Sequence, residues 1–180
     1  MTNSAAQAAS LIAAENGLIN HIRQHAELST AFHVPESWSY RSQFHLLLAL
    51  RRRFTPTPSP DDLIGMPDRL CYSNAARYAQ NHRAEGVVYA EGFALTHDGL
   101  DFYLPHAWVV RPDGSMLDPT WDDAPGRAYV GIPVTNSHLW PVDGGGLLHE
   151  IDRTLPLLRD GFPADAAADL GRPLTSEGAL

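Results

Sequence analysis

Apolar residues recur with a helical period along the first third of the chain. Between residues 4 and 28, Ala, Leu and Ile lie at spacings near 3.6 with no proline, which predicts an amphipathic helix. Pro35 interrupts this pattern, and a second helix is predicted from about Ser37 to Arg53. The run Thr55-Pro56-Thr57-Pro58-Ser59-Pro60 cannot continue that helix, because each proline lacks an N–H donor and restricts the residue before it.

From residue 68 onward the pattern predicts one helix followed by strands. Asp68 is a candidate N-cap, and the helix that it opens ends at Gly86. Pro112-Asp113-Gly114 is typical of a tight turn, because proline presets one dihedral angle and glycine accepts a positive one. We expect the segments on both sides of this turn to form a hairpin. Strand-forming residues fill three segments, 87–95, 102–110 and 128–134.

The order of these elements is helices, then a helix that carries a cysteine, then an antiparallel meander, which predicts an α+β fold. We expect a single domain over residues 1–180, because about 55 N-terminal residues are too few for a stable domain of their own. Within it we expect a helical part at 1–54, a core at 61–162 and a frayed tail at 163–180, which is rich in Ala, Asp and Gly.

Composition limits the classes of function. Of 180 residues, 44% are hydrophobic and 19% are charged, as in ordinary globular proteins, and the net charge of -8 argues against nucleic-acid binding. No segment reaches the roughly 18 apolar residues of a membrane span, no signal peptide is visible, and a lone cysteine forms no internal disulfide. We therefore expect a cytoplasmic protein. His21 and His25 lack a third metal ligand, and no cofactor-binding motif is present, so we expect neither metal nor cofactor.

Three residues carry candidate chemistry: Cys71, His106 and Asp118. The only cysteine of the chain lies in the first turn of a predicted helix, where unpaired N–H groups and the helix dipole favour a thiolate and can stabilise an oxyanion. His106 and Asp118 flank the predicted hairpin turn at an even spacing, which lets both face one side of the sheet. Thiol, imidazole base and orienting carboxylate together make a cysteine nucleophile triad.

Two sequence blocks resemble the transglutaminase-like branch of the papain-like cysteine enzymes. One is Cys71 opening an Ala-rich helix, and the other is Pro105-His106-Ala107-Trp108-Val109-Val110 followed by Leu117-Asp118-Pro119-Thr120. The match covers roughly residues 68 to 121. The resemblance implies that Cys71 is the nucleophile, His106 the base and Asp118 the orienting carboxylate. It also implies a catalytic helix packed on an antiparallel sheet, to which this chain adds N-terminal helices.

The residues beside the cysteine depart from the family, whose members commonly have Gly or Trp there. Leu70 precedes it and Tyr72 follows, so the side-chain donor to the oxyanion is unassigned. We consider Glu91 either a cleft residue or a solvated edge position. Trp108 and Trp121, which flank His106 and Asp118, are either core walls or substrate platforms. The candidates for binding substrate or the oxyanion are Gln43, Tyr40, Tyr72, Glu91, Trp108 and Trp121.

The residues leave three functions open. The first is hydrolysis of an amide, isopeptide or ester through a thioester acyl-enzyme. The second is acyl transfer to an amine, or deamidation of a glutamine side chain, on the same triad. The third is an inert binding or scaffold protein in which Cys71 is a structural thiol. The small size of the chain favours hydrolysis, with a peptide, a protein or a small amide as substrate.

Overall fold

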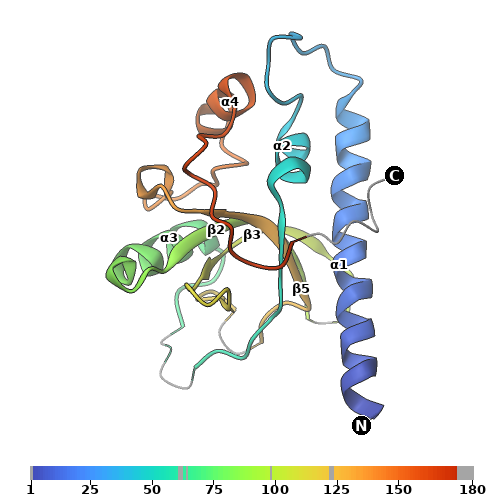
Figure 1. Cartoon of the computed structure of the whole chain (residues 1–180), viewed down its shortest axis with the longest axis vertical. Coiled ribbons are helices and arrows are strands. Elements are labelled where there is room, and N and C mark those ends of the chain that lie inside the picture. The colour runs from blue at the N-terminus through green and yellow to red at the C-terminus, as the bar shows by residue number, and fades with distance from the viewer. Residues whose placement is uncertain (1, 61–62, 64, 98, 122–123, 174–180) are drawn as a thin grey trace.

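The computed structural model describes residues 2–60, 63, 65–97, 99–121 and 124–173. This part of the chain forms four α-helices and five β-strands (Figure 1), which confirms the predicted α+β class. The helices are α1 (Thr2–Ser29), α2 (Gln43–Leu50), α3 (Cys71–Asn81) and α4 (Ile151–Asp160). The strands are β1 (Arg52–Phe54), β2 (Val88–Leu95), β3 (Tyr103–Val110), β4 (Met116–Leu117) and β5 (Ala128–Val134).

The first predicted helix is confirmed by α1, whereas the second is shorter than predicted. Helix α2 begins only after Ser42, whose hydroxyl accepts a hydrogen bond from His45 N at 3.4 Å. The backbone becomes extended at Arg51, and the segment that follows pairs with β5 as β1. Pairing with a neighbouring strand thus overrides the helical pattern of this segment. Helix α4 was not predicted, because Pro156 interrupts its helical pattern.

The predicted strands and the hairpin are confirmed by β2, β3, β5 and the antiparallel pairing of β3 with β4. The fraying expected of the tail is wrong for its described residues. Ala167 bridges to Val134, and Arg172 bridges to Arg53. Backbone pairing therefore holds this segment against the edges of the sheet, while residues 174–180 lie outside the described part of the chain.

The sheet has the strand order β1-β5-β2-β3-β4, with antiparallel neighbours throughout, and it is strongly curled. Phe54 on β1 and Trp108 on β3 are three strand positions apart, yet their ring centroids are separated by only 5.5 Å. A flat sheet would hold them about 14 Å apart. The Tyr129 ring also lies 5.1 Å from Trp108. These three aromatic residues therefore fill the concave face of the sheet.

Small residues at the centre of the concave face make room for the aromatic rings. Alternation along the strands places Ala90 and Gly92 of β2 on this face, together with Gly131 of β5. A Cβ added at Gly131 would come within 2.5 Å of the Trp108 ring. A Cβ added at Gly92 would overlap the carbonyl oxygen of Val130. The curl therefore depends on glycine at both positions.

Helices cover the opposite, convex face. Phe93 lies on that face, where its ring contacts His21 of α1 at 5.5 Å and Phe44 of α2 at 6.1 Å. Helix α3 packs mainly against β3 and β2. In Figure 1, α1 and α3 lie on opposite flanks of the sheet, with α2 and α4 above it. The N-terminal helices and the sheet therefore share one continuous core.

Gly92→Ala is expected to lower the free energy of unfolding by about 3 kcal/mol. The added Cβ would meet backbone atoms of β5, which cannot move away without breaking the strand pairing. Gly17→Ala in α1 is the matched control, because the atom nearest to its Cβ is the terminal hydroxyl of Tyr103 at 2.8 Å. Alanine is also the better helix former by about 1 kcal/mol. Chemical denaturation measures both variants, and a Gly92→Ala protein as stable as wild type would contradict this packing.

Candidate active site

The cysteine is the first residue of α3, and its N-cap is Leu70 rather than the predicted Asp68. Arg69 between them has a φ of 63°, in the left-handed region, which turns the chain away before the helix begins. The first helical hydrogen bond runs from Asn74 N to Leu70 O, at 2.8 Å. The N–H groups of residues 71–73 precede it and have no acceptor within the helix. They are placed to stabilise negative charge near the start of α3.

The start of α3 lies beside an unpaired edge of β3. Strand β4 pairs with Val109 and Val110 only, and α3 packs against β3. Cys71 lies close enough to His106, on the concave face, to raise the pKa of that imidazole. Tyr72 instead interacts with Glu91, on the convex face. The first two residues of α3 therefore interact with opposite faces of the sheet.

His106 and Asp118 are joined by a hydrogen bond of 2.7 Å between Nε2 and Oδ2, and both side chains are buried. Continuing the register of β3 with β4 places Asp118 across from Trp108, so its contact with His106 is diagonal. Because Asp118 engages Nε2, Nδ1 is the ring nitrogen left for Cys71. The structure thus brings the three predicted triad residues together.

Asp118 is held by three further donors. Its Oδ1 accepts hydrogen bonds from Thr120 N at 3.0 Å and from Trp121 N at 3.1 Å, and its Oδ2 accepts one from the Tyr129 hydroxyl at 2.8 Å. The Trp121 ring stacks on the His106 ring, with 3.9 Å between centroids and 15° between planes. Trp121 is therefore a wall that fixes the imidazole. The contribution of Tyr129 has no signal in the sequence, because only the curl of the sheet carries β5 to Asp118.

The charges of the pair follow from these contacts. Burial alone would lower the pKa of His106, but the hydrogen bond with Asp118 and the neighbouring Cys71 outweigh burial and raise the pKa to about 9. Burial likewise disfavours the Asp118 carboxylate, yet hydrogen bonds from His106, Trp121 N and Tyr129 keep the pKa of Asp118 below its ordinary value. At neutral pH the pair is therefore an imidazolium and a carboxylate.

This raised pKa makes the contribution of His106 to stability depend on pH. A group with a raised pKa in the folded state adds stability that is complete below its unfolded pKa of 6.5 and is lost as pH rises through about 9. The difference in unfolding free energy between wild type and His106→Gln should therefore be larger at about pH 6 than at about pH 10, by about 3 kcal/mol. Denaturation at both pH values measures this difference, and an equal difference at both would contradict the assigned charge.

Asn74 connects α3 to the segment that carries the triad aspartate. Its side chain is buried, and Nδ2 donates hydrogen bonds to Pro67 O at 2.8 Å and to Thr120 Oγ1 at 3.0 Å. From the sequence, Asn74 is expected to be a polar residue on the face of the helix one turn after Cys71, and its burial corrects that expectation. Asn74 therefore fixes the start of α3 relative to Asp118.

Glu91 is 1% exposed, so a solvated edge position is wrong. Its carboxylate accepts hydrogen bonds from the Tyr89 hydroxyl at 2.5 Å, from Leu147 N at 2.6 Å and from Leu148 N at 2.8 Å. His149 Nδ1 lies 3.1 Å from the same carboxylate. These contacts engage both carboxylate oxygens and hold residues 147–149 against β2.

Tyr72 packs on this carboxylate cluster. Its ring lies 5.9 Å from that of His149, and a Cβ added at Gly146 would be 2.9 Å from the Tyr72 ring and 2.5 Å from Glu91 Oε1. Burial and the neighbouring Glu91 raise the pKa of Tyr72, so the hydroxyl stays neutral. Tyr72 thus joins α3 to the segment at 147–149.

The other three candidates lie elsewhere. Tyr40 N donates a hydrogen bond to Leu158 O at 3.0 Å, near the end of α4. Gln43 opens α2, which packs mainly against α1, β5 and α4. Trp108 is fully buried in the concave core and is a core wall. No described contact ties these three residues to Cys71, so the backbone N–H groups at the start of α3 are the donors available for an oxyanion.

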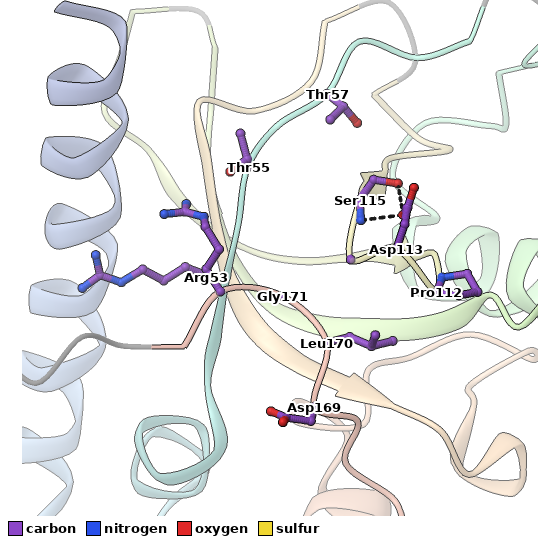
Figure 2. Close-up of a pocket in the computed structure, with 11 residues that line it drawn as sticks. Arg53, Thr55, Thr57, Pro112, Asp113, Ser115, Asp169, Leu170 and Gly171 are labelled. Carbon is purple, nitrogen blue, oxygen red and sulfur yellow. Dashed lines mark hydrogen bonds between the residues drawn. The ribbon is translucent and has the colours of Figure 1, made fainter. Parts of the chain in front are cut away.

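A cavity of about 540 Å³ lies between the β3–β4 turn, the segment after β1 and the tail, and none of the triad residues lines it. Figure 2 shows Asp113 and Ser115 on one side of this cavity, joined by hydrogen bonds. The Arg53 guanidinium, also at this cavity, is paired with Glu15 of α1. Both charged groups named here therefore have a partner within the protein, and the cavity lies apart from Cys71, His106 and Asp118.

The described residues include neither a group of metal ligands nor a membrane-spanning helix. Among the described residues, no three His, Cys, Asp or Glu side chains are grouped to hold a metal ion, and the His21 and His25 rings contact each other at 4.5 Å. No helix in the described ranges has the length and apolar character needed to cross a membrane. The chain matches no protein-family model, no curated protein and no solved structure.

Proposed function

We propose that the protein is a cysteine-triad enzyme that acts on an amide- or isopeptide-type carbonyl through a thioester acyl-enzyme, and that it is a hydrolase. The observation that carries the proposal is the position of His106, which is hydrogen-bonded to Asp118, lies beside Cys71 and has its pKa raised to about 9. An imidazolium beside a cysteine favours the thiolate, which is the reactive form.

The proposed reaction has two steps. In the first, Cys71 Sγ bonds to the carbonyl carbon, the oxyanion is stabilised by N–H groups at the start of α3, and His106 gives its proton to the departing amine. The carbon–nitrogen bond breaks and a thioester remains. In the second, His106 takes a proton from water as the water oxygen attacks the thioester, which releases the acid and the thiolate. Asp118 keeps the imidazole oriented in both steps.

We further propose that the fold belongs to the transglutaminase-like branch of the papain-like enzymes. Three features support this: a cysteine at the start of a helix, a His-Ala-Trp strand of a curled antiparallel sheet, and an Asp-Pro-Thr segment just after the next strand. The buried hydrogen bond between His106 and Asp118 joins the two sheet segments as this assignment requires.

An activated ester tests the proposed function without knowledge of the substrate. With p-nitrophenyl acetate we expect a burst of about one equivalent of nitrophenol, acetylation of Cys71 by mass spectrometry, and no burst from Cys71→Ser. Loss of the acetyl group in water would support the hydrolase. Loss only after addition of an amine would favour an acyltransferase instead. An unacylated Cys71 in folded protein would favour the inert scaffold.

A further inference from the structure

Three exposed apolar residues lie within four positions of the proposed nucleophile or base along the chain. Leu70, directly before Cys71, is 52% exposed. Phe102 and Leu104, at the start of β3 just before His106, are 52% and 40% exposed. We call Leu70, Phe102 and Leu104 the apolar rim.

The backbone places two members of the apolar rim, Phe102 and Leu104, on the face of the sheet that carries His106. Along an extended strand, alternate residues share a face, so Phe102 and Leu104 lie on the face of His106, with Leu104 about 7 Å from it along the strand. Tyr103 between them lies on the other face, where its ring stacks on His21 of α1 at 4.9 Å. Helix α1 therefore covers one face of the sheet at the start of β3, and the face beside His106 is left exposed.

Scattered exposed apolar residues are common and need no function. The apolar rim differs because its members come from two separate segments that meet at the Cys71–His106 contact. A charged pair lies nearby, where Arg127 Nη1 and Asp101 Oδ1 are 2.7 Å apart. An apolar surface with charged groups beside it is typical of a binding site.

We propose that the apolar rim binds an apolar acyl group or side chain attached to the reacting carbonyl, so that the substrates are acyl donors with an apolar chain. This inference rests on the proposed function. The occupant is a substrate rather than another protein surface, because a chain lying along Leu104 leads directly to the Cys71–His106 contact. Each methylene that the rim removes from water should raise the acylation rate by about two- to fourfold.

A series of p-nitrophenyl esters tests this proposal, from acetate through butyrate to hexanoate. For each protein we measure the second-order rate constants for acylation of Cys71 by the hexanoate and acetate esters and take the ratio of hexanoate to acetate. This ratio is then divided by the corresponding ratio for a small free thiol. We expect a ratio of about 10 or more in wild type and a ratio near unity in the double variant Phe102→Ser, Leu104→Ser. Leu104→Ile should keep the wild-type ratio, and thermal melting shows that each variant is folded.

Ile12→Ser and Leu28→Ser are matched controls, since these α1 residues are 50% and 68% exposed and should leave the ratio unchanged.

A wild-type ratio near unity, with Cys71 still acylated, would overturn this inference and leave the proposed function intact. A high ratio that survives the double substitution would also overturn it. No acylation by any ester would refute the proposed function itself. Gel filtration that shows a dimer broken by the double variant, with a flat ratio, would assign the rim to a second copy of the chain.

Discussion

His106→Ala should slow the alkylation of Cys71 by iodoacetamide about 100-fold at about pH 6, where an ordinary cysteine is less than about 1% thiolate. The hydrogen bond with Asp118 and the neighbouring Cys71 raise the pKa of His106 to about 9, so an imidazolium faces the sulfur at this pH. The variant removes that charge and leaves a thiol in a partly buried position. Because the chain has one cysteine, the incorporated label reports Cys71 alone.

His149→Ala is the control for this experiment. His149 is also near the start of α3, through its ring contact with Tyr72, but its Nδ1 is engaged by Glu91 rather than by the triad. We expect this variant to be alkylated at close to the wild-type rate. His106→Gln provides a second test if the alanine variant unfolds. Folded variants with equal rates at His106 and His149 would show that the imidazole does not activate the thiol.

Glu91→Ala should reduce the free energy of unfolding by about 4 kcal/mol, because it deprives several buried donors of their acceptor at about 1–3 kcal/mol each. Two of those donors are the backbone N–H groups of Leu147 and Leu148, and a third is the Tyr89 hydroxyl. The loss should therefore loosen the segment at 147–149 from β2 and weaken the packing of Tyr72.

Glu85→Ala is the matched control for Glu91→Ala. The Glu85 side chain is 69% exposed and pairs with His82 at 3.0 Å on the surface. Removal of such a pair changes stability by no more than about 1 kcal/mol. Urea denaturation of both variants gives the comparison. Equal stabilities would mean that the Glu91 carboxylate is not the acceptor that holds this cluster.

The sequence predicts correctly those helices and strands whose own residues carry a periodic apolar pattern. Helix α1 and strands β2, β3 and β5 follow the periodicity of their own residues, and the hairpin follows its Pro-Asp-Gly turn. Strand β1 exists only because β5 lies beside it, so a helical pattern was misleading there. The same holds for the tail, where Arg172 finds its partner on β1.

The candidate site shows the same division between local and distant information. His106 and Asp118 could be paired from sequence because one short turn connects them. Tyr129 could not, since it reaches Asp118 only across the concave face of the curled sheet. Glu91 was ambiguous because strand alternation gives a face but not burial, and the backbone donors that hold it are far along the chain.

Acetylation of Cys71 in wild type and in His106→Ala tests the proposed triad most directly, because the chain has a single cysteine. His106 lies beside the sulfur and is held by Asp118, so it is placed to activate Cys71. After brief exposure to p-nitrophenyl acetate at neutral pH, we predict that mass spectrometry finds the acetyl group on Cys71 of wild type and little on folded His106→Ala. Equal acetylation of the two folded proteins, at the rate of a small free thiol, would contradict the proposed triad.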